Sequence, residues 1–237
     1  ACDERLSWLT GFTGSAGICI VGNDGAGVFV DGRYSIQAKK QTKSPFQVIQ
    51  WNKKNFLQWI EKNIVKGEIG FDPWLHSNKE IIGLSEAFAD KGISFVPSDN
   101  LIDKVWLTRP LRVSSQVMSY PFKLAGLTAK DKCQQIAEII RFKKADTALI
   151  TLPDSIAWLL NLRGNDVIHN PILHAFLIIS SKGKIKLFCE NKNISNSISG
   201  LENFVEVFPI ASFEAALTKL VGSVLVDETT VPFAAVK

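Results

Sequence analysis

The sequence is poor in the residues that build catalytic and metal centres. It contains three histidines and four cysteines among 237 residues. The cysteines lie far apart and form no Cys-x-x-Cys pair, which favours free thiols in a reducing cytoplasm. No His-Glu-x-x-His motif occurs, and His169 and His174 are separated by Pro171 at a spacing that suits metal ligands poorly. Hydrogen-bonded structural histidines are favoured, and no Ser–His–Asp or Cys–His set stands out.

Long apolar runs and one-sided charge are also missing. No uninterrupted apolar stretch approaches the roughly 20 residues of a membrane span, and no secretory signal opens the chain. The net charge is +4, with 27 Lys and Arg against 23 Asp and Glu, spread evenly along the chain. No basic arm or stripe therefore marks a nucleic-acid surface. We expect a cytoplasmic protein that binds neither nucleic acid nor membrane.

What the sequence does contain is an alternation of strands and helices. Apolar strands are expected at 18–21, 27–31, 68–71, 93–96, 148–152, 175–179, 184–189, 204–208 and 224–227, and amphipathic helices at 55–64, 77–91, 128–144 and 212–221. Ser77 and Glu80 form a capping box at the start of the second helix. With 46% hydrophobic residues, the chain can bury packed cores. The pattern is typical of an α/β fold with largely covered sheets.

One stretch, residues 155–171, stands out, and it has an earlier counterpart. It opens as an apolar helical turn around Trp158, for which Asp154 is expected to be the N-cap, and breaks at Gly164 into a polar run. Trp8 and Gly14 repeat the Trp158–Gly164 spacing at an offset of 150 residues. A strand, a polar turn and a second strand follow each copy. This self-similarity predicts two related domains, although chance recurrence of Trp-Leu and Gly is the alternative.

We therefore predict two α/β domains of similar topology, residues 1–112 and 113–237, each with a mixed β-sheet flanked by helices. The connection is expected within 103–121, which has little periodicity and contains Arg109-Pro110 and Tyr120-Pro121. No strand precedes the Trp8 turn, so the first strand of the fold is expected before Ala1. The end at Lys237 likewise reads as an interruption after a strand–helix junction.

Two arginines are the candidate binding residues. Arg33 follows the strand that ends near Val30 and falls in a first helical turn, where the helix dipole disfavours a cation. It is either a solvated surface residue or a contact for a carboxylate of a peptide or a neighbouring chain. Arg163 precedes Gly164 and either pairs internally with Asp166 or points into an interdomain cleft. The residues alone leave both alternatives open.

Four motifs resemble those of a known family. They are Trp-Leu-Thr-Gly-Phe-Thr-Gly-Ser-Ala-Gly at 8–17, Asp-Gly-Arg-Tyr-x-x-Gln-Ala at 31–38, Asp-Lys-x-Trp at 103–106 with Arg109-Pro110, and Ile-Ala-Trp-Leu-Leu-Asn-Leu-Arg-Gly-Asn-Asp-Val at 156–167 with His169-Asn170-Pro171. Together they resemble aminopeptidase P, the Xaa-Pro aminopeptidase of the pita-bread metallopeptidases, in its long three-domain form. The resemblance extends over essentially the whole chain.

The resemblance covers only the first two, creatinase-type N-terminal domains of that family. In the family, two Asp, one His and two Glu of a third, C-terminal domain bind two divalent metals, usually Mn²⁺. We therefore expect the parent protein to be a proline-specific aminopeptidase acting on short peptides with proline at the second position. These 237 residues are expected to hold no metal or cofactor and to be inactive alone.

The resemblance also suggests roles for individual residues. It implies that Arg33 contacts the bound peptide and that Arg163 lies near the mouth of the catalytic cleft. His169 and Asn170 match a motif whose role is structural. The N-terminal domains of the family narrow access to the metal site and take part in dimer contacts, so a homodimer is expected for the parent.

Two alternatives remain beside this interpretation. A catalytically inactive, peptidase-like module that binds peptides or histones has the same two-domain architecture, as in a histone-chaperone subunit. The motifs fit the active enzymes better, and metal ligands in the downstream sequence would distinguish the two. Prolidase and creatinase are disfavoured because those chains have a single N-terminal domain.

Overall fold

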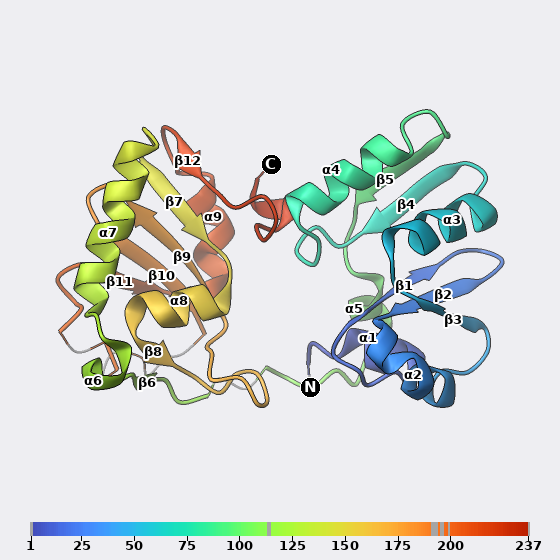
Figure 1. Cartoon of the computed structure of the whole chain (residues 1–237), viewed down its shortest axis with the longest axis horizontal. Helices are drawn as coiled ribbons and strands as arrows, with labels where there is room; N and C mark the ends of the chain where they lie inside the picture. The colour runs from blue at the N-terminus through green and yellow to red at the C-terminus, as the bar shows by residue number, and fades with distance from the viewer. Residues whose placement is uncertain (1, 113–114, 191–193, 195–196, 199, 237) are drawn as a thin grey trace. The chain divides into compact units, whose positions relative to one another are not determined.

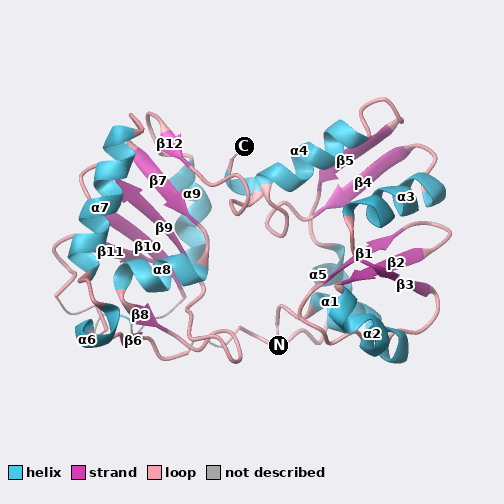
Figure 2. Ribbon diagram, in the orientation of Figure 1, coloured by secondary structure: helices cyan, strands magenta, loops and turns pink. Residues whose placement is uncertain are grey.

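The computed structural model describes residues 2–112, 115–190, 194, 197–198 and 200–236. The chain divides into two units. Unit 1 comprises Ala1–Asp72 and Gly83–Arg112, and unit 2 comprises Pro73–Ile82 and Val113–Lys237. Strands and helices alternate in both (Figure 1), and the ribbon in Figure 2 shows sheets flanked by helices in each unit. The predicted α/β class with mixed sheets is confirmed.

Unit 1 contains two small sheets. Its elements are α1 (Arg5–Thr10), β1 (Gly17–Val21), β2 (Ala26–Val30), η1 (Gly32–Tyr34), α2 (Ser35–Gln41), β3 (Phe46–Gln50), α3 (Lys53–Asn63), β4 (Gly67–Phe71), the second half of α4 (Asn78–Ala87), β5 (Ile93–Pro97) and α5 (Leu101–Val105). In the first sheet, β2 pairs antiparallel with β1 and parallel with β3. The second sheet is the parallel pair of β4 and β5.

The strand β2 is the centre of unit 1 because apolar cores cover both of its faces. All five of its residues are buried. On one face, Phe29 packs with Phe56 and Trp59 of α3, in a core that also takes in residues of β4 and β5. On the other face, Val28 and Val30 pack with residues including Leu6 of α1 and Ala38 of α2. Such an uninterrupted apolar strand is what a covered sheet requires.

Unit 2 contains one five-stranded mixed sheet in the order β11-β10-β9-β7-β12. Its elements are β6 (Met118–Ser119), α6 (Phe122–Ala125), α7 (Ala129–Phe142), β7 (Thr147–Ile150), α8 (Pro153–Leu160), β8 (Leu162–Arg163), β9 (Ala175–Ser180), β10 (Ile185–Cys189), β11 (Val205–Phe208), η3 (Ile210–Ser212), α9 (Phe213–Leu217), β12 (Val224–Leu225) and η4 (Phe233–Ala235). The strand β9 is antiparallel to β7 and β10, whereas β12 is parallel to β7 and β11 to β10. One core lies under α7 and α8, and a second packs around Phe213 of α9.

Residues 73–82, which include the first half of α4, are part of unit 2. The N–H of Asn78 donates to the carbonyl of Val231 at 3.0 Å, and that of Phe233 to His76 at 2.9 Å. Trp74 packs its ring against Phe176 of β9 and Phe213 of α9, with centroids 5.7 and 6.1 Å apart. Backbone hydrogen bonds and aromatic packing therefore hold this segment within unit 2.

The predicted repeat is present in the structure. Each unit has a helix (α1 or α8), an antiparallel hairpin (β1–β2 or β9–β10) and a strand parallel to the second hairpin strand (β3 or β11). The helices recur at an offset of 150 residues, whereas β2 and β10, which start at Ala26 and Ile185, are 159 apart. The second copy thus carries extra residues between its helix and its hairpin, and these include the polar run after Gly164.

Several local expectations were wrong. The helix expected at 212–221 ends as α9 at Leu217, because the chain continues in tighter turns, with the Lys219 N–H bonded to the Ala216 carbonyl. Asp154 is not the N-cap of α8. The helix begins one residue earlier at Pro153, and the Asp154 carboxylate accepts from the Ser155 N–H at 2.9 Å within the first turn. Within the expected connection at 103–121, α5 and β6 supply regular structure.

Candidate functional site

Arg33 lies in the 3₁₀ turn η1 that joins β2 to α2. Asp31 precedes the turn, and its Oδ1 accepts from the Arg33 backbone N–H and from Arg33 Nε, both at 2.9 Å. The guanidinium carbon stands 5.6 Å from the centroid of the Tyr34 ring, and the side chain is 74% exposed. The Asp31 carboxylate offsets the unfavourable placement of a cation at the start of a helix.

The electrostatics of this pair keep both groups charged. The hydrogen bond from the Arg33 side chain, followed by that from its backbone N–H, lowers the pKa of Asp31. The same side-chain bond raises the pKa of Arg33. Only Nε is used, so among the described residues the two terminal amino groups of Arg33 have no recorded hydrogen-bond acceptor. A planar fork of donors is therefore available for a carboxylate or carbonyl oxygen.

Neutral polar side chains of the two motifs are hydrogen-bonded to one another within unit 1, and one of them is Tyr34, whose ring lies near Arg33. The hydroxyl groups of Tyr34 and Ser15 are 2.8 Å apart, and Thr13 Oγ1 accepts from the side-chain amides of Gln37 and Gln41 at 3.1 and 2.9 Å. The motif at 8–17 and the motif at 31–38 are thus brought together at one end of β2. The arrangement offers hydrogen-bonding groups but no acid–base or nucleophile pair.

Arg163 has a different environment. Its Nη1 donates to the carbonyls of Ala157 and Leu162 at 3.0 and 2.8 Å, and its guanidinium carbon lies 4.0 Å from the centroid of the Tyr120 ring. The possible internal pair with Asp166 does not form. The Arg163 side chain links α8 to β8 by its hydrogen bonds to these two carbonyls. It links both to the end of β6 by stacking on the Tyr120 ring. It belongs to unit 2, and Arg33 to unit 1.

Asp166 is used instead to hold the polar run in place. Its two carboxylate oxygens accept from the backbone N–H groups of Ser115 and His174, each at 2.8 Å. His169 has a φ of 64°, and the neighbouring Asn170 N–H donates to the Val167 carbonyl at 3.1 Å. The side chains of His169 and Asn170 are exposed, while their backbone forms the turn.

A buried lysine is the residue that the sequence analysis missed. Lys132 of α7 is 1% exposed, and its ammonium group donates to the Trp158 carbonyl and to Asn161 Oδ1, both at 2.6 Å. It also lies 4.5 Å from the centroid of the Trp158 ring. Burial, and then the Arg163 charge, lower its pKa. The sequence could have indicated this burial, because Lys132 lies on the apolar stripe of the predicted helix, beside Cys133 and one turn before Ile136.

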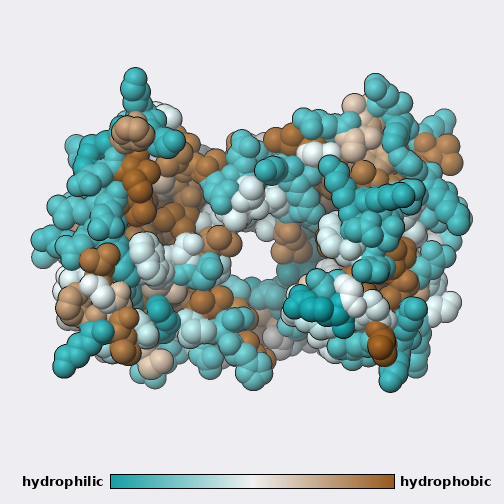
Figure 3. All heavy atoms as spheres, viewed as in Figure 1, coloured by the Kyte–Doolittle hydropathy of each residue, from teal (hydrophilic) through white to brown (hydrophobic). Residues whose placement is uncertain are grey.

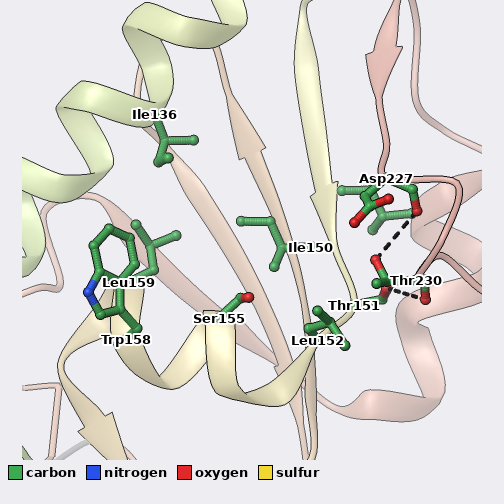
Figure 4. A pocket seen from close by; sticks show the side chains of 10 residues that line it. Ile136, Ile150, Thr151, Leu152, Ser155, Trp158, Leu159, Asp227 and Thr230 are labelled. Atoms are coloured by element: carbon green, nitrogen blue, oxygen red, sulfur yellow. Dashed lines mark hydrogen bonds between the residues drawn. The ribbon is translucent and has the colours of Figure 1, made fainter.

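Unit 2 also has a largely apolar groove beside α7, where the surface in Figure 3 is hollowed and apolar side chains gather. Its volume is about 270 Å³, and Figure 4 shows Ile136, Ile150, Trp158 and Leu159 directed toward it. Asp227 stands at its edge, and hydrogen bonds from Thr229 lower the pKa of this carboxylate. Neither Arg33 nor Arg163 lines the groove.

In the part of the chain that the structure describes, no three or more His, Cys, Asp or Glu side chains come together in a way that could hold a metal ion. No helix of this part is long and apolar enough to cross a membrane. The four cysteines are free, as predicted, and those at 133 and 189 are buried.

Comparison with known proteins gives two matches along the chain. Models of the creatinase/prolidase N-terminal domain match residues 2–105 and residues 108–237. Aminopeptidase P1 of Lotus japonicus is 32% identical over 92% of this chain, and aminopeptidase P2 of Arabidopsis thaliana is 32% identical over 97%. The chain spans 34% of the length of each of these relatives.

A solved structure has the same fold over almost the whole chain. It is the X-prolyl aminopeptidase of Caenorhabditis elegans, described as a cytosolic enzyme with a di-nuclear active site. The TM-score is 0.90 at 26% sequence identity, and the match covers 99% of this chain and 40% of that protein.

Proposed function

This chain belongs to the creatinase/prolidase N-terminal domain family, and on that premise we propose that it is the non-catalytic N-terminal region of a metal-dependent Xaa-Pro aminopeptidase. Such an enzyme removes the N-terminal residue that precedes a proline. The identity to plant aminopeptidases P over more than nine-tenths of the chain supports this proposal. Their greater length leaves room for a catalytic domain outside these residues.

The parent enzyme's chemistry is part of the same proposal. Two divalent metals, Mn²⁺ by resemblance, would be held by that other domain, and the parent would be a cytoplasmic homodimer. The C. elegans enzyme, which has a di-nuclear site, supports the two-metal part of the proposal. Plant and fungal relatives that match the chain carry aminopeptidase names, which favours the enzyme over the inactive binding module.

Within these domains, we assign the contact with the peptide to Arg33. The observation that carries the assignment is its exposed guanidinium, which Asp31 holds by Nε alone, with both terminal amino groups directed to no acceptor among the described residues. Remote contacts of this kind orient a peptide and select its length without touching the metal. Arg163 is the weaker candidate, because backbone carbonyls and the Tyr120 ring already occupy its guanidinium.

The test is Arg33→Ala in the full-length enzyme. A charge-assisted hydrogen bond contributes about 1.5–3 kcal/mol, so kcat/KM for longer Xaa-Pro peptides should fall by about one to two decades. Metal content and melting temperature should barely change, because the side chain is exposed. Arg33→Lys should recover only part of the activity, since lysine keeps the charge but loses the fork of donors.

Two results would contradict the assignment. An unchanged kcat/KM for Arg33→Ala would make the arginine an ordinary surface residue. A large loss of stability would point to the Asp31 pair as a structural element. Asp31→Asn is the matched control, because it weakens the ion pair and leaves the guanidinium in place; it should reduce kcat/KM less than Arg33→Ala does.

A further inference from the structure

Asp31 and Arg33 form an ion pair that stands alone at the turn between β2 and α2 (Figure 1). Among the described residues, neither side chain forms an ion pair with a third residue. The Tyr34 ring lies beside the guanidinium, and its hydroxyl is 2.8 Å from that of Ser15, so the adjoining polar groups are neutral. The opposite charges of the pair therefore largely cancel at a distance, and an approaching anion gains little attraction from the arginine.

Both members of the pair keep unused hydrogen-bonding groups. The Asp31 Oδ1 atom accepts from the backbone N–H and from Nε of Arg33, both at 2.9 Å. Among the described residues, Asp31 Oδ2 accepts no hydrogen bond, and the two terminal amino groups of Arg33 donate none. The two side chains are 40% and 74% exposed. The pair thus offers a ligand one acceptor beside a fork of donors.

The turn fixes the acceptor and the donors relative to each other. Asp31 is the N-cap of η1, where its carboxylate accepts from the Arg33 N–H. The Tyr34 N–H donates to the Asp31 carbonyl at 2.9 Å, and all five residues of β2, which leads into the turn, are buried. Groups that are already held in place lose little conformational freedom when a ligand binds them.

A peptide backbone carries the groups that match this arrangement. The N–H and C=O of one residue in an extended chain point to the same side, as they do when two antiparallel strands exchange a pair of hydrogen bonds. Asp31 Oδ2 can accept from such an N–H while Arg33 donates to the C=O. A terminal carboxylate offers acceptors only, and it would also meet the like charge of Asp31. The chemistry of the pair therefore favours backbone amide groups over a free C-terminus.

Given the proposed function, in which Arg33 contacts the peptide, we propose that the Asp31–Arg33 pair binds the N–H and C=O groups of one backbone residue of a longer Xaa-Pro peptide and does not select a free C-terminal carboxylate. The pair then distinguishes substrates by their length and not by the charge of their C-terminus. Peptides with an amidated C-terminus belong to its substrate class. Proline, which lacks an N–H, is a poor occupant of this position.

The test uses the full-length enzyme and a series of Xaa-Pro peptides of increasing length, each made as the free acid and as the C-terminal amide. The kcat/KM of wild type and of Arg33→Ala is measured for every peptide. The shortest peptide for which the variant is slower than wild type is the one whose last residue reaches the pair. At that length the amide end still supplies both an N–H and a C=O, whereas the acid end supplies only a carboxylate.

At that length, Arg33→Ala should reduce kcat/KM for the amide by about tenfold or more. Wild type should hydrolyse the amide at least as well as the free acid, once both are divided by the values for Arg33→Ala, which carry any end-group preference of the rest of the enzyme. Asp31→Asn keeps an acceptor but removes the like charge. It should therefore shift the preference toward the free acid, by about threefold or more.

Three results would overturn the proposal, and they have different meanings. A preference of wild type for the free acid of about tenfold that disappears in Arg33→Ala would make Arg33 a carboxylate site, with its contact to the peptide intact. An acid-to-amide ratio that Asp31→Asn leaves unchanged would exclude the role given to the Asp31 charge. No effect of Arg33→Ala at any length would overturn the proposed function itself.

Discussion

At the scale of single residues, the two candidate arginines show how neighbours decide a role that sequence leaves open. Arg33 is 74% exposed and makes one side-chain bond, to Asp31. Arg163 donates to two backbone carbonyls and stacks on Tyr120. Both follow an apolar segment and precede a turn, so their sequence contexts look alike. The difference arises from residues distant in sequence, such as Tyr120, which no local pattern reveals.

Lys132 leads to a prediction about pH and stability. Its pKa is lowered by burial first and by Arg163 second, so the folded chain binds this proton more weakly than the unfolded chain does. Between the lowered pKa and the ordinary value of 10.5, the unfolded state holds more protons, and the free energy of unfolding rises with pH through that window. Below the window, the lysine carries its full desolvation cost.

Lys132→Met should abolish the rise of the unfolding free energy with pH, and it should also destabilise the chain. The Trp158 carbonyl and Asn161 Oδ1 would lose their buried donor, at a cost of about 1–3 kcal/mol. Urea unfolding of both proteins at pH 7, 9 and 10 measures the two effects. The difference in unfolding free energy between wild type and variant should increase toward pH 10. A difference in unfolding free energy that stays constant or decreases toward pH 10 would contradict the lowered pKa.

At the scale of elements, periodicity predicted most of the fold. The strands at Ile93–Pro97 and Ala175–Ser180 and the helix Ala129–Phe142 lie within a residue or two of their expected positions, because strong apolar patterns and a Thr128 cap specify them locally. The shortness of α9 was not predictable, because its amphipathic pattern continues past Leu217 while the backbone tightens. The pairing of residues 73–82 with residues near Val231 was also missed, since long-range contacts leave no periodic signal.

The candidate site was predicted less completely than the fold. The motifs selected Arg33, and the structure adds the Asp31 pair and the polar side chains around Tyr34. The sequence offered Asp166 as a partner for Arg163, but its carboxylate binds backbone N–H groups from two other segments. Charge proximity in sequence could not reveal this, because the partners converge only in the folded chain. The resemblance to aminopeptidase P, drawn from the motifs, is confirmed by the relatives.

The repeated glycine after each helix is required by close packing. A Cβ on Gly164 would lie 2.9 Å from the Ile172 carbonyl oxygen and 3.0 Å from Leu173 Cβ. Since the nearest atom belongs to the backbone, the chain must shift, and Gly164→Ala should destabilise by about 1–3 kcal/mol. Gly83→Ala is the control, because no atom lies within 4 Å of its Cβ in α4; it should stabilise by up to about 1 kcal/mol. Urea unfolding measures both, and equal effects would contradict the packing explanation.

At the scale of the whole molecule, the chain combines two repeated folding units with very little reactive chemistry. The polar groups around Tyr34 can bind but contain no nucleophile with a base, and Asp166 is committed to backbone N–H groups. The predicted boundary, 1–112 and 113–237, remains a proposal. Trp74 packs on Phe176 and Phe213, so we expect an isolated 113–237 segment to be less stable than the same segment within the whole chain.

The same reasoning predicts that the 237-residue chain alone neither binds Mn²⁺ tightly nor hydrolyses an Xaa-Pro peptide. Mn²⁺ prefers clustered carboxylate ligands with imidazole, and the described residues bring no such group of three together. A metal-dependent peptidase also needs the ion to activate water and polarise the carbonyl. Calorimetric titration with Mn²⁺ and an assay of proline-containing peptides check both points, with the full-length parent as the active control. One or two stoichiometric tight sites in the isolated chain would contradict the proposed division, in which these domains bind and orient the peptide while another domain performs the chemistry.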